Sequence, residues 1–175
     1  FNRHGFLRRN QGLLYLFRTD VDLLSTAAAL HEAGYNVLMF DFRNHGESAA
    51  GKTAIGLNEA WDVVGAVDYL KQRFPDKRHA IGFVSFCMGA DATLIALSRI
   101  KDELEPVKCL VAVQPISAEV FIRAYLRSTF TKVSWVLIPM VDRMAFWMGG
   151  HHLDEMTPLP ACADLRVPVL FIQGK

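Results

Sequence analysis

The chain of 175 residues lacks the cysteine content of a disulfide-rich secreted protein and the residue spacing of a structural metal site. It has only three cysteines, Cys87, Cys109 and Cys162, an odd and scattered set that suits a reducing compartment better than a disulfide framework. No cysteine or histidine cluster has the spacing of a zinc site. We therefore expect a cytoplasmic protein with no metal and no cofactor.

The chain also has no large excess of positive or negative charge. The 19 Lys and Arg residues nearly balance 18 Asp and Glu residues, and no long basic run exists, so we expect no nucleic-acid partner. The longest apolar region, 133–150, is interrupted by Pro139, Asp142 and Arg143 and does not read as a stable membrane span. An amphipathic element that touches lipid is the alternative for this region.

The two ends of the chain are unusual. It starts with Phe1 rather than Met, and Lys175 directly follows an expected strand. We expect a fragment that is truncated at both ends.

Apolar periodicity predicts alternating helices and strands. In the first helix, Leu23, Ala27 and Leu30 share one face, and Gly34 follows its end. Pro75 stops the second helix. The predicted helices are 20–33, 59–74, 90–100 and 159–165, and the predicted strands are 35–40, 80–84, 107–113 and 167–173. This alternation is typical of an α/β fold with a mostly parallel sheet and helices on both faces.

Cys87 occupies the most informative position. A short apolar strand runs into Ser85-Phe86-Cys87-Met88-Gly89, and a helix begins at once. A strand, one sharp turn and a helix, with a nucleophile-capable residue at the apex, form the layout of a nucleophile elbow. Ser85 and Gly89 supply the small residues that such a turn needs on either side. The alternative is that Cys87 is a small buried hydrophobic residue.

Several segments, in order, resemble the α/β-hydrolase family. Residues 34–48, which end in Asn44-His45-Gly46-Glu47-Ser48, resemble the strand and loop of that family, with Asn44 in place of the commoner Gly. Residues 1–6 look like the end of a strand with its His4-Gly5 oxyanion motif, and residues 168–174 look like the strand that precedes the catalytic acid. With the elbow, these segments cover nearly the whole chain.

The resemblance implies a hydrolase that cleaves a carboxylic ester, thioester or amide through an acyl-cysteine intermediate on Cys87. Backbone N–H groups of Met88 and Phe6 would form the oxyanion hole. Cysteine in place of serine is similar to the dienelactone-hydrolase branch. An acyltransferase with the same nucleophile and a non-catalytic binding protein of this fold are the alternatives.

The same resemblance assigns structural roles to the loop residues His4, Gly5 and His45. It places the catalytic acid and histidine beyond Lys175, with Glu119 and the pair Asp154-Glu155 as weak substitutes. His151 and His152 with that acidic pair resemble a metal cluster, but adjacent histidines tend to point apart, and a solvated loop explains them better.

The resemblance also suggests a division of the chain. Residues 1–116 would form the hydrolase core, 117–150 a helical cap or lid, and 151–175 a return to the core. The aromatic and aliphatic side chains of 117–150 suit either a roof over an apolar acyl pocket or ordinary packing on the sheet. Arg123, Arg127 and Lys132 could meet an anionic substrate, although a solvated helix face accounts for them more simply.

Overall fold

The computed structural model describes residues 23–75 and 80–174. The chain divides into two compact units, residues 1–49 and residues 50–175, and each is described by itself. Helix α1 (Leu24–Glu32) belongs to the smaller unit. Its Leu23, Ala27 and Leu30 positions are half-buried, which confirms the predicted face. Gly34 follows the helix with a φ of +93°, a left-handed conformation that glycine adopts without strain.

The predicted strand over residues 35–40 is wrong in this structure. The segment has no strand hydrogen bonding within the described residues, and Tyr35, Val37, Leu38, Met39 and Phe40 are exposed. An apolar run favours a strand only where a neighbouring strand satisfies its backbone N–H and C=O groups. Within the described residues, no strand pairs with this segment.

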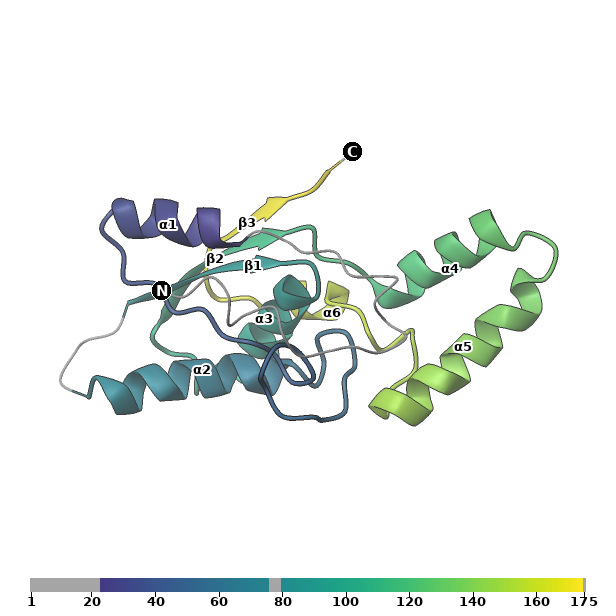
Figure 1. Ribbon diagram of the computed structural model, residues 1–175, viewed down its shortest axis with the longest axis horizontal. Coiled ribbons are helices and arrows are strands. Elements are labelled where there is room, and N and C mark those ends of the chain that lie inside the picture. Colours follow the sequence, from purple (N-terminus) through teal and green to yellow (C-terminus); the bar gives the residue numbers. More distant parts are fainter. Residues whose placement is uncertain (1–22, 76–79, 175) are drawn as a thin grey trace. The chain divides into compact units, whose positions relative to one another are not determined.

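The larger unit contains a three-stranded parallel sheet (Figure 1). Its strands are β1 (Ile81–Phe86), β2 (Val107–Val113) and β3 (Val169–Ile172), in the order β1-β2-β3. Phe86 pairs with Val113, and Val113 pairs with Ile172, so the three strands end side by side. The residues that follow these ends therefore gather along one edge of the sheet.

Helix α3 (Met88–Arg99) lies at the centre of this unit (Figure 1). Every residue from Ala90 to Ser98 is buried, because α3 contacts β1, β2, α2 (Ala60–Arg73) and α6 (Leu159–Cys162). A helix that is apolar or small on all sides is typical of such a position. Helix α2 buries Ala60, Val63, Val64 and Val67.

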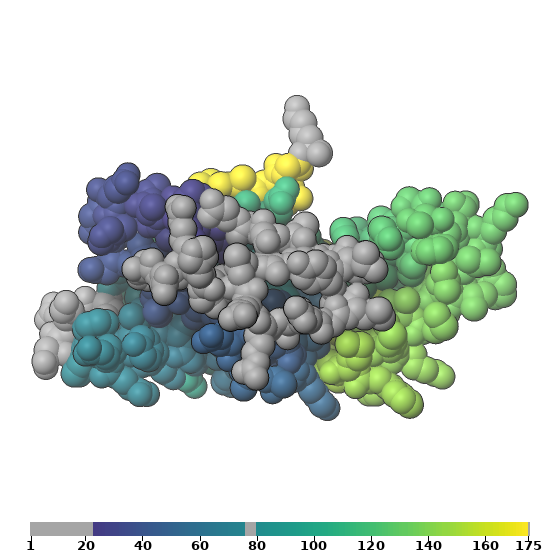
Figure 2. Space-filling view, in the orientation of Figure 1, coloured from purple at the N-terminus to yellow at the C-terminus, as the bar shows by residue number. Residues whose placement is uncertain are grey.

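Helices α4 (Ala118–Thr129) and α5 (Ser134–Gly149) form a hairpin within the predicted 117–150 insertion. The amide of Asn58 donates a 3.0 Å hydrogen bond to the Gly149 carbonyl, which ties the end of α5 to the loop before α2. Most large apolar side chains of the hairpin remain exposed, including Trp135 and Trp147, and the hairpin surface is visible in green in Figure 2. Ordinary packing on the sheet does not account for these side chains.

Across residues 23–75 and 80–174, none of the helices combines the length and the apolar character that a membrane crossing requires.

Candidate active site

Cys87 lies in the one-residue turn between β1 and α3, as the sequence predicts. Its backbone has a φ of +49° and a ψ of −123°, and its side chain is exposed. A residue with a Cβ rarely adopts a positive φ, and such strained residues are concentrated at functional sites. The exposed thiol rules out the alternative in which Cys87 is a buried hydrophobic residue.

Backbone hydrogen bonds hold this strained turn in place. The N–H of Cys87 donates to the Val113 carbonyl at 2.9 Å, which ties the turn to the end of β2. The Cys87 carbonyl accepts from the N–H groups of Ala90 at 2.9 Å and Asp91 at 3.2 Å. The turn is therefore fixed on one side to the sheet and on the other to the first turn of α3.

Ser85 and Gly89, the small residues on either side of Cys87, are joined through Thr93. The Thr93 hydroxyl donates to the Gly89 carbonyl at 2.8 Å, so the Ser85 hydroxyl, 2.9 Å from Thr93 Oγ1, donates to Thr93. Ser85 and Thr93 are both buried. This chain of two hydrogen bonds links the end of β1 to the start of α3.

The N–H groups of Met88 and Gly89 begin α3 and point out of its N-terminus. Within the described residues no acceptor takes either group, as expected of the first positions of a helix. Unpaired N–H groups together with the helix dipole favour a negative charge at this point. The exposed thiol and two open donors thus lie next to each other in the chain.

Asp91, to which no sequence motif points, is completely buried one turn beyond Cys87. Its Oδ1 atom accepts the Ile116 N–H at 3.0 Å, and its Oδ2 atom has no hydrogen-bond partner in the part of the chain that is described. Burial raises the pKa of this carboxyl to about 7, against a smaller opposite effect of the Ile116 N–H. The all-round small and apolar residues of α3 are the sequence signal for this burial.

Other predicted site residues contribute less. His4, Gly5 and Phe6 lie outside the described residues. His45 belongs to the smaller unit, where its Nδ1 atom lies 2.9 Å from the Arg43 carbonyl oxygen, a local hydrogen bond. Glu119 accepts a 2.8 Å bond from Arg123 Nε. Nowhere in the described residues does a histidine bond to Cys87.

His151 and His152 form separate acidic pairs and not one cluster. His151 Nδ1 lies 3.3 Å from Glu155 Oε2, whereas His152 Nδ1 lies 2.8 Å from Asp142 Oδ2. The bond to Asp142 raises the pKa of His152, and the Leu153 N–H is the main cause of the lowered pKa of Asp142. Residues 23–75 and 80–174 contain no group of three or more His, Cys, Asp or Glu side chains arranged to hold a metal ion.

The chain is similar to a protein family, to a curated relative and to a solved structure. Residues 4–150 match the sequence pattern of the family described as alpha/beta hydrolase fold. The uncharacterized protein YqkD of Bacillus subtilis (strain 168) is 31% identical over 160 residues, which make up 89% of this chain and 51% of YqkD. Two crystal forms of the Pyrococcus furiosus esterase Pf2001 are each 29% identical, with TM-scores of 0.62 and 0.63.

The match to the Pf2001 esterase covers 86% of this chain in both crystal forms, and 53% and 54% of the esterase. The chain therefore spans about half the length of the relatives that it matches.

Proposed function

The chain belongs to the α/β-hydrolase fold family, and from that premise we propose that it cleaves carboxylic esters, thioesters or amides with the Cys87 thiol as nucleophile. The observation that carries the proposal is the left-handed, exposed conformation of Cys87 beside the open N–H groups of α3. The similarity to an esterase supports the reaction class. Backbone strain of this kind is kept at sites where it has a function, such as holding a side chain where it can reach a substrate.

The chemistry follows from this placement. The Cys87 thiolate attacks the carbonyl carbon, and the Met88 N–H donates a hydrogen bond to the oxygen on which negative charge develops. The C–O, C–S or C–N bond to the leaving group then breaks, and the acyl group stays on sulfur. The leaving group takes up from water the proton that the thiol gave up on ionisation, and it departs as an alcohol, thiol or amine. Water attacks this thioester, releases a carboxylic acid and regenerates the thiol.

We also propose that the division into core, cap and return segment holds, with α4 and α5 as the cap of an apolar acyl site. The support is the exposed aromatic and aliphatic surface of the hairpin, and the bond from Asn58 that fixes its end to the core. A small-molecule acyl substrate with an apolar body fits such a surface.

The test is acylation by p-nitrophenyl acetate, measured as intact mass with peptide mapping. This readout detects the first covalent step without requiring turnover. Cys109→Ala is the matched control, because Cys109 on β2 is also an exposed free thiol but has no elbow. We expect rapid acetylation of the wild-type and Cys109→Ala proteins at Cys87 and none at that position in Cys87→Ala.

Two outcomes would contradict the proposal. The first is acetylation of Cys109 as fast as that of Cys87, which would show ordinary thiol reactivity. The second is release of p-nitrophenolate by Cys87→Ala at the wild-type rate, which would show that another residue is the nucleophile. Faster release in the presence of an added alcohol or amine would instead identify an acyltransferase with the same nucleophile.

A further inference from the structure

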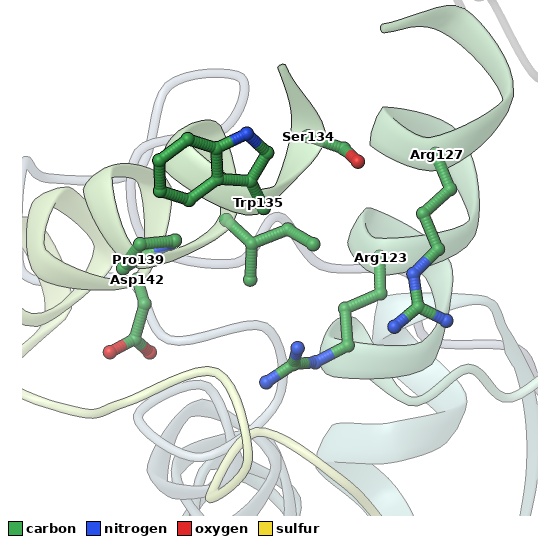
Figure 3. A pocket seen from close by; sticks show the side chains of 7 residues that line it. Arg123, Arg127, Ser134, Trp135, Pro139 and Asp142 are labelled. Carbon is green, nitrogen blue, oxygen red and sulfur yellow. The ribbon is translucent and has the colours of Figure 1, made fainter. Parts of the chain in front are cut away.

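A cavity of about 490 Å³ lies between α4 and α5 (Figure 3). Helix α4 contributes Arg123 and Arg127, and α5 faces them with Trp135, Pro139 and Asp142 (Figure 3). Ser134 and Ile138 complete the lining. A volume of this size is typical of a site for a small organic molecule.

The charges around this cavity are unevenly compensated. Arg123 Nε donates to Glu119 Oε1 at 2.8 Å. Asp142 accepts the Leu153 N–H at 2.8 Å and lies 2.8 Å from the His152 ring, so both of its oxygens are occupied. No described residue accepts a hydrogen bond from the Arg127 guanidinium. Arg127 is therefore the cation of the cavity that has no acidic partner in the described part of the chain.

Two arginines four positions apart on one helix face repel each other, and an anion between them removes that repulsion. The Leu153 N–H and His152 are the main causes of the lowered pKa of Asp142 on the opposite helix, and the charge of Arg123 adds a smaller contribution. Figure 3 shows both guanidinium groups on the side of the cavity that faces α5. The arrangement suits a planar anion that receives parallel N–H donors from Arg127.

On the opposite wall, the apolar side chains of Trp135 and Pro139 lie on the same helix as the carboxylate of Asp142. Trp135 is 76% exposed, which is unusual for a tryptophan, and Pro139 lies one helical turn further along α5. Ile138, which also lines the cavity, is buried. An aromatic or aliphatic body placed along this wall would shield the indole from water.

We propose that the α4–α5 cavity binds an organic carboxylate, with the carboxylate on Arg127 and the apolar body against Trp135 and Pro139. One uncompensated guanidinium matches one negative charge, which favours a carboxylate over a phosphate dianion. This binding does not require acyl transfer at Cys87. An experiment can therefore refute this proposal and leave the proposed function standing, and the reverse also holds.

The experiment is isothermal titration of the purified protein with 2-naphthoate. The neutral analogue 2-naphthalenemethanol has the same ring system without the charge, and 2-naphthyl phosphate carries the alternative anion. The key variant is Arg127→Gln. Lys132→Gln is the matched control, because Lys132 is an exposed cation of the same hairpin that does not line the cavity.

We expect Arg127→Gln to weaken 2-naphthoate binding about tenfold, equivalent to about 1.4 kcal/mol, while Lys132→Gln changes it less than about twofold. Arg127→Lys keeps the charge but loses the fork of donors, so its affinity should be intermediate. Wild-type protein should bind 2-naphthalenemethanol about tenfold more weakly than 2-naphthoate.

Equal affinity of wild-type protein for the acid and the alcohol would overturn the proposal, as would unchanged binding in Arg127→Gln. Tighter binding of 2-naphthyl phosphate than of 2-naphthoate would overturn the assignment of the ligand as a carboxylate. If 2-naphthoate at millimolar concentration produces no heat of binding with the wild-type protein, the proposed site is refuted.

Discussion

Replacement of Asp91 by asparagine should flatten the dependence of protein stability on pH. Asp91 is completely buried on α3, accepts one N–H from Ile116, and has a pKa of about 7 in the folded protein. Asparagine has nearly the same shape, and its carbonyl oxygen can accept the same Ile116 N–H. The variant therefore removes the titration of this side chain and retains its one described hydrogen bond.

The sign and size of the effect follow from proton linkage. Because the pKa rises from its ordinary value of 3.8 to about 7, the folded state holds the Asp91 proton more tightly than the unfolded state. The stability that this provides is fully present below the unfolded pKa and is lost as pH rises through the folded pKa. The free energy of unfolding should fall by up to about 1.4 kcal/mol per pH unit in that range.

Between pH 5 and pH 8 this linkage amounts to about 2–3 kcal/mol in the wild-type protein. Asp91→Asn should lack that component. Its amide nitrogen replaces an oxygen without a described partner, and a buried donor without an acceptor costs about 1–3 kcal/mol at every pH. That cost shifts the whole curve of stability against pH but does not change its slope.

Urea unfolding at four pH values between 5 and 8 measures the free energy of unfolding of each protein. Asp102→Asn is the control, because it makes the same Asp-to-Asn change at an exposed position. If Asp91→Asn and wild-type curves run parallel within about 0.5 kcal/mol across this range, the carboxyl does not titrate there and the reasoning is refuted.

Four other predictions concern single positions. Cys87→Gly should raise the free energy of unfolding by about 1 kcal/mol, because glycine adopts the positive φ of this position without strain. Cys87→Ala should not raise it. Equal urea midpoints for the two variants would contradict this prediction. Gly56→Ala should destabilise the protein by about 3 kcal/mol, because φ is +106° and a Cβ would lie 2.8 Å from a side-chain carbon of α3. Gly65→Ala, with open space around its Cβ in α2, should instead stabilise it by about 0.5–1 kcal/mol, and the same measurement compares the two. Asp142→Asn should lower the pKa of His152 toward its ordinary value, since their hydrogen bond is the largest cause of the raised pKa; an unchanged NMR titration of the ring would contradict it.

Local patterns predict the elements that carry the candidate site. The apolar run after Pro106 predicts β2 at its observed bounds, Val107–Val113. The Ser85-to-Gly89 pattern predicts the strand, turn and helix around Cys87, because only small residues fit beside a strained apex. In both cases the information lies within a few residues of the element, so the sequence alone is sufficient.

Features that depend on distant neighbours are not predicted. Residues 35–40 have the composition of a buried strand, but composition does not specify a pairing partner. The burial of Asp91 depends on α2, α6 and the Ile116 loop closing around α3, although the small residues of α3 hint at it. The cavity beside Arg127 exists because α4 and α5 pack together, a contact that no local pattern shows.

The complete burial of α3 affects how the elbow moves. Amide hydrogens within Ala90–Ser98 can exchange with solvent only when the core opens, so we expect them to be among the slowest to exchange. Helix ends normally fray, which would let a strained residue at the N-terminus relax. Here α3 is buried from Ala90 onward, and the backbone N–H of Cys87 donates a hydrogen bond to Val113 at the end of β2. We therefore expect the backbone of the elbow to keep its conformation as long as this core stays closed.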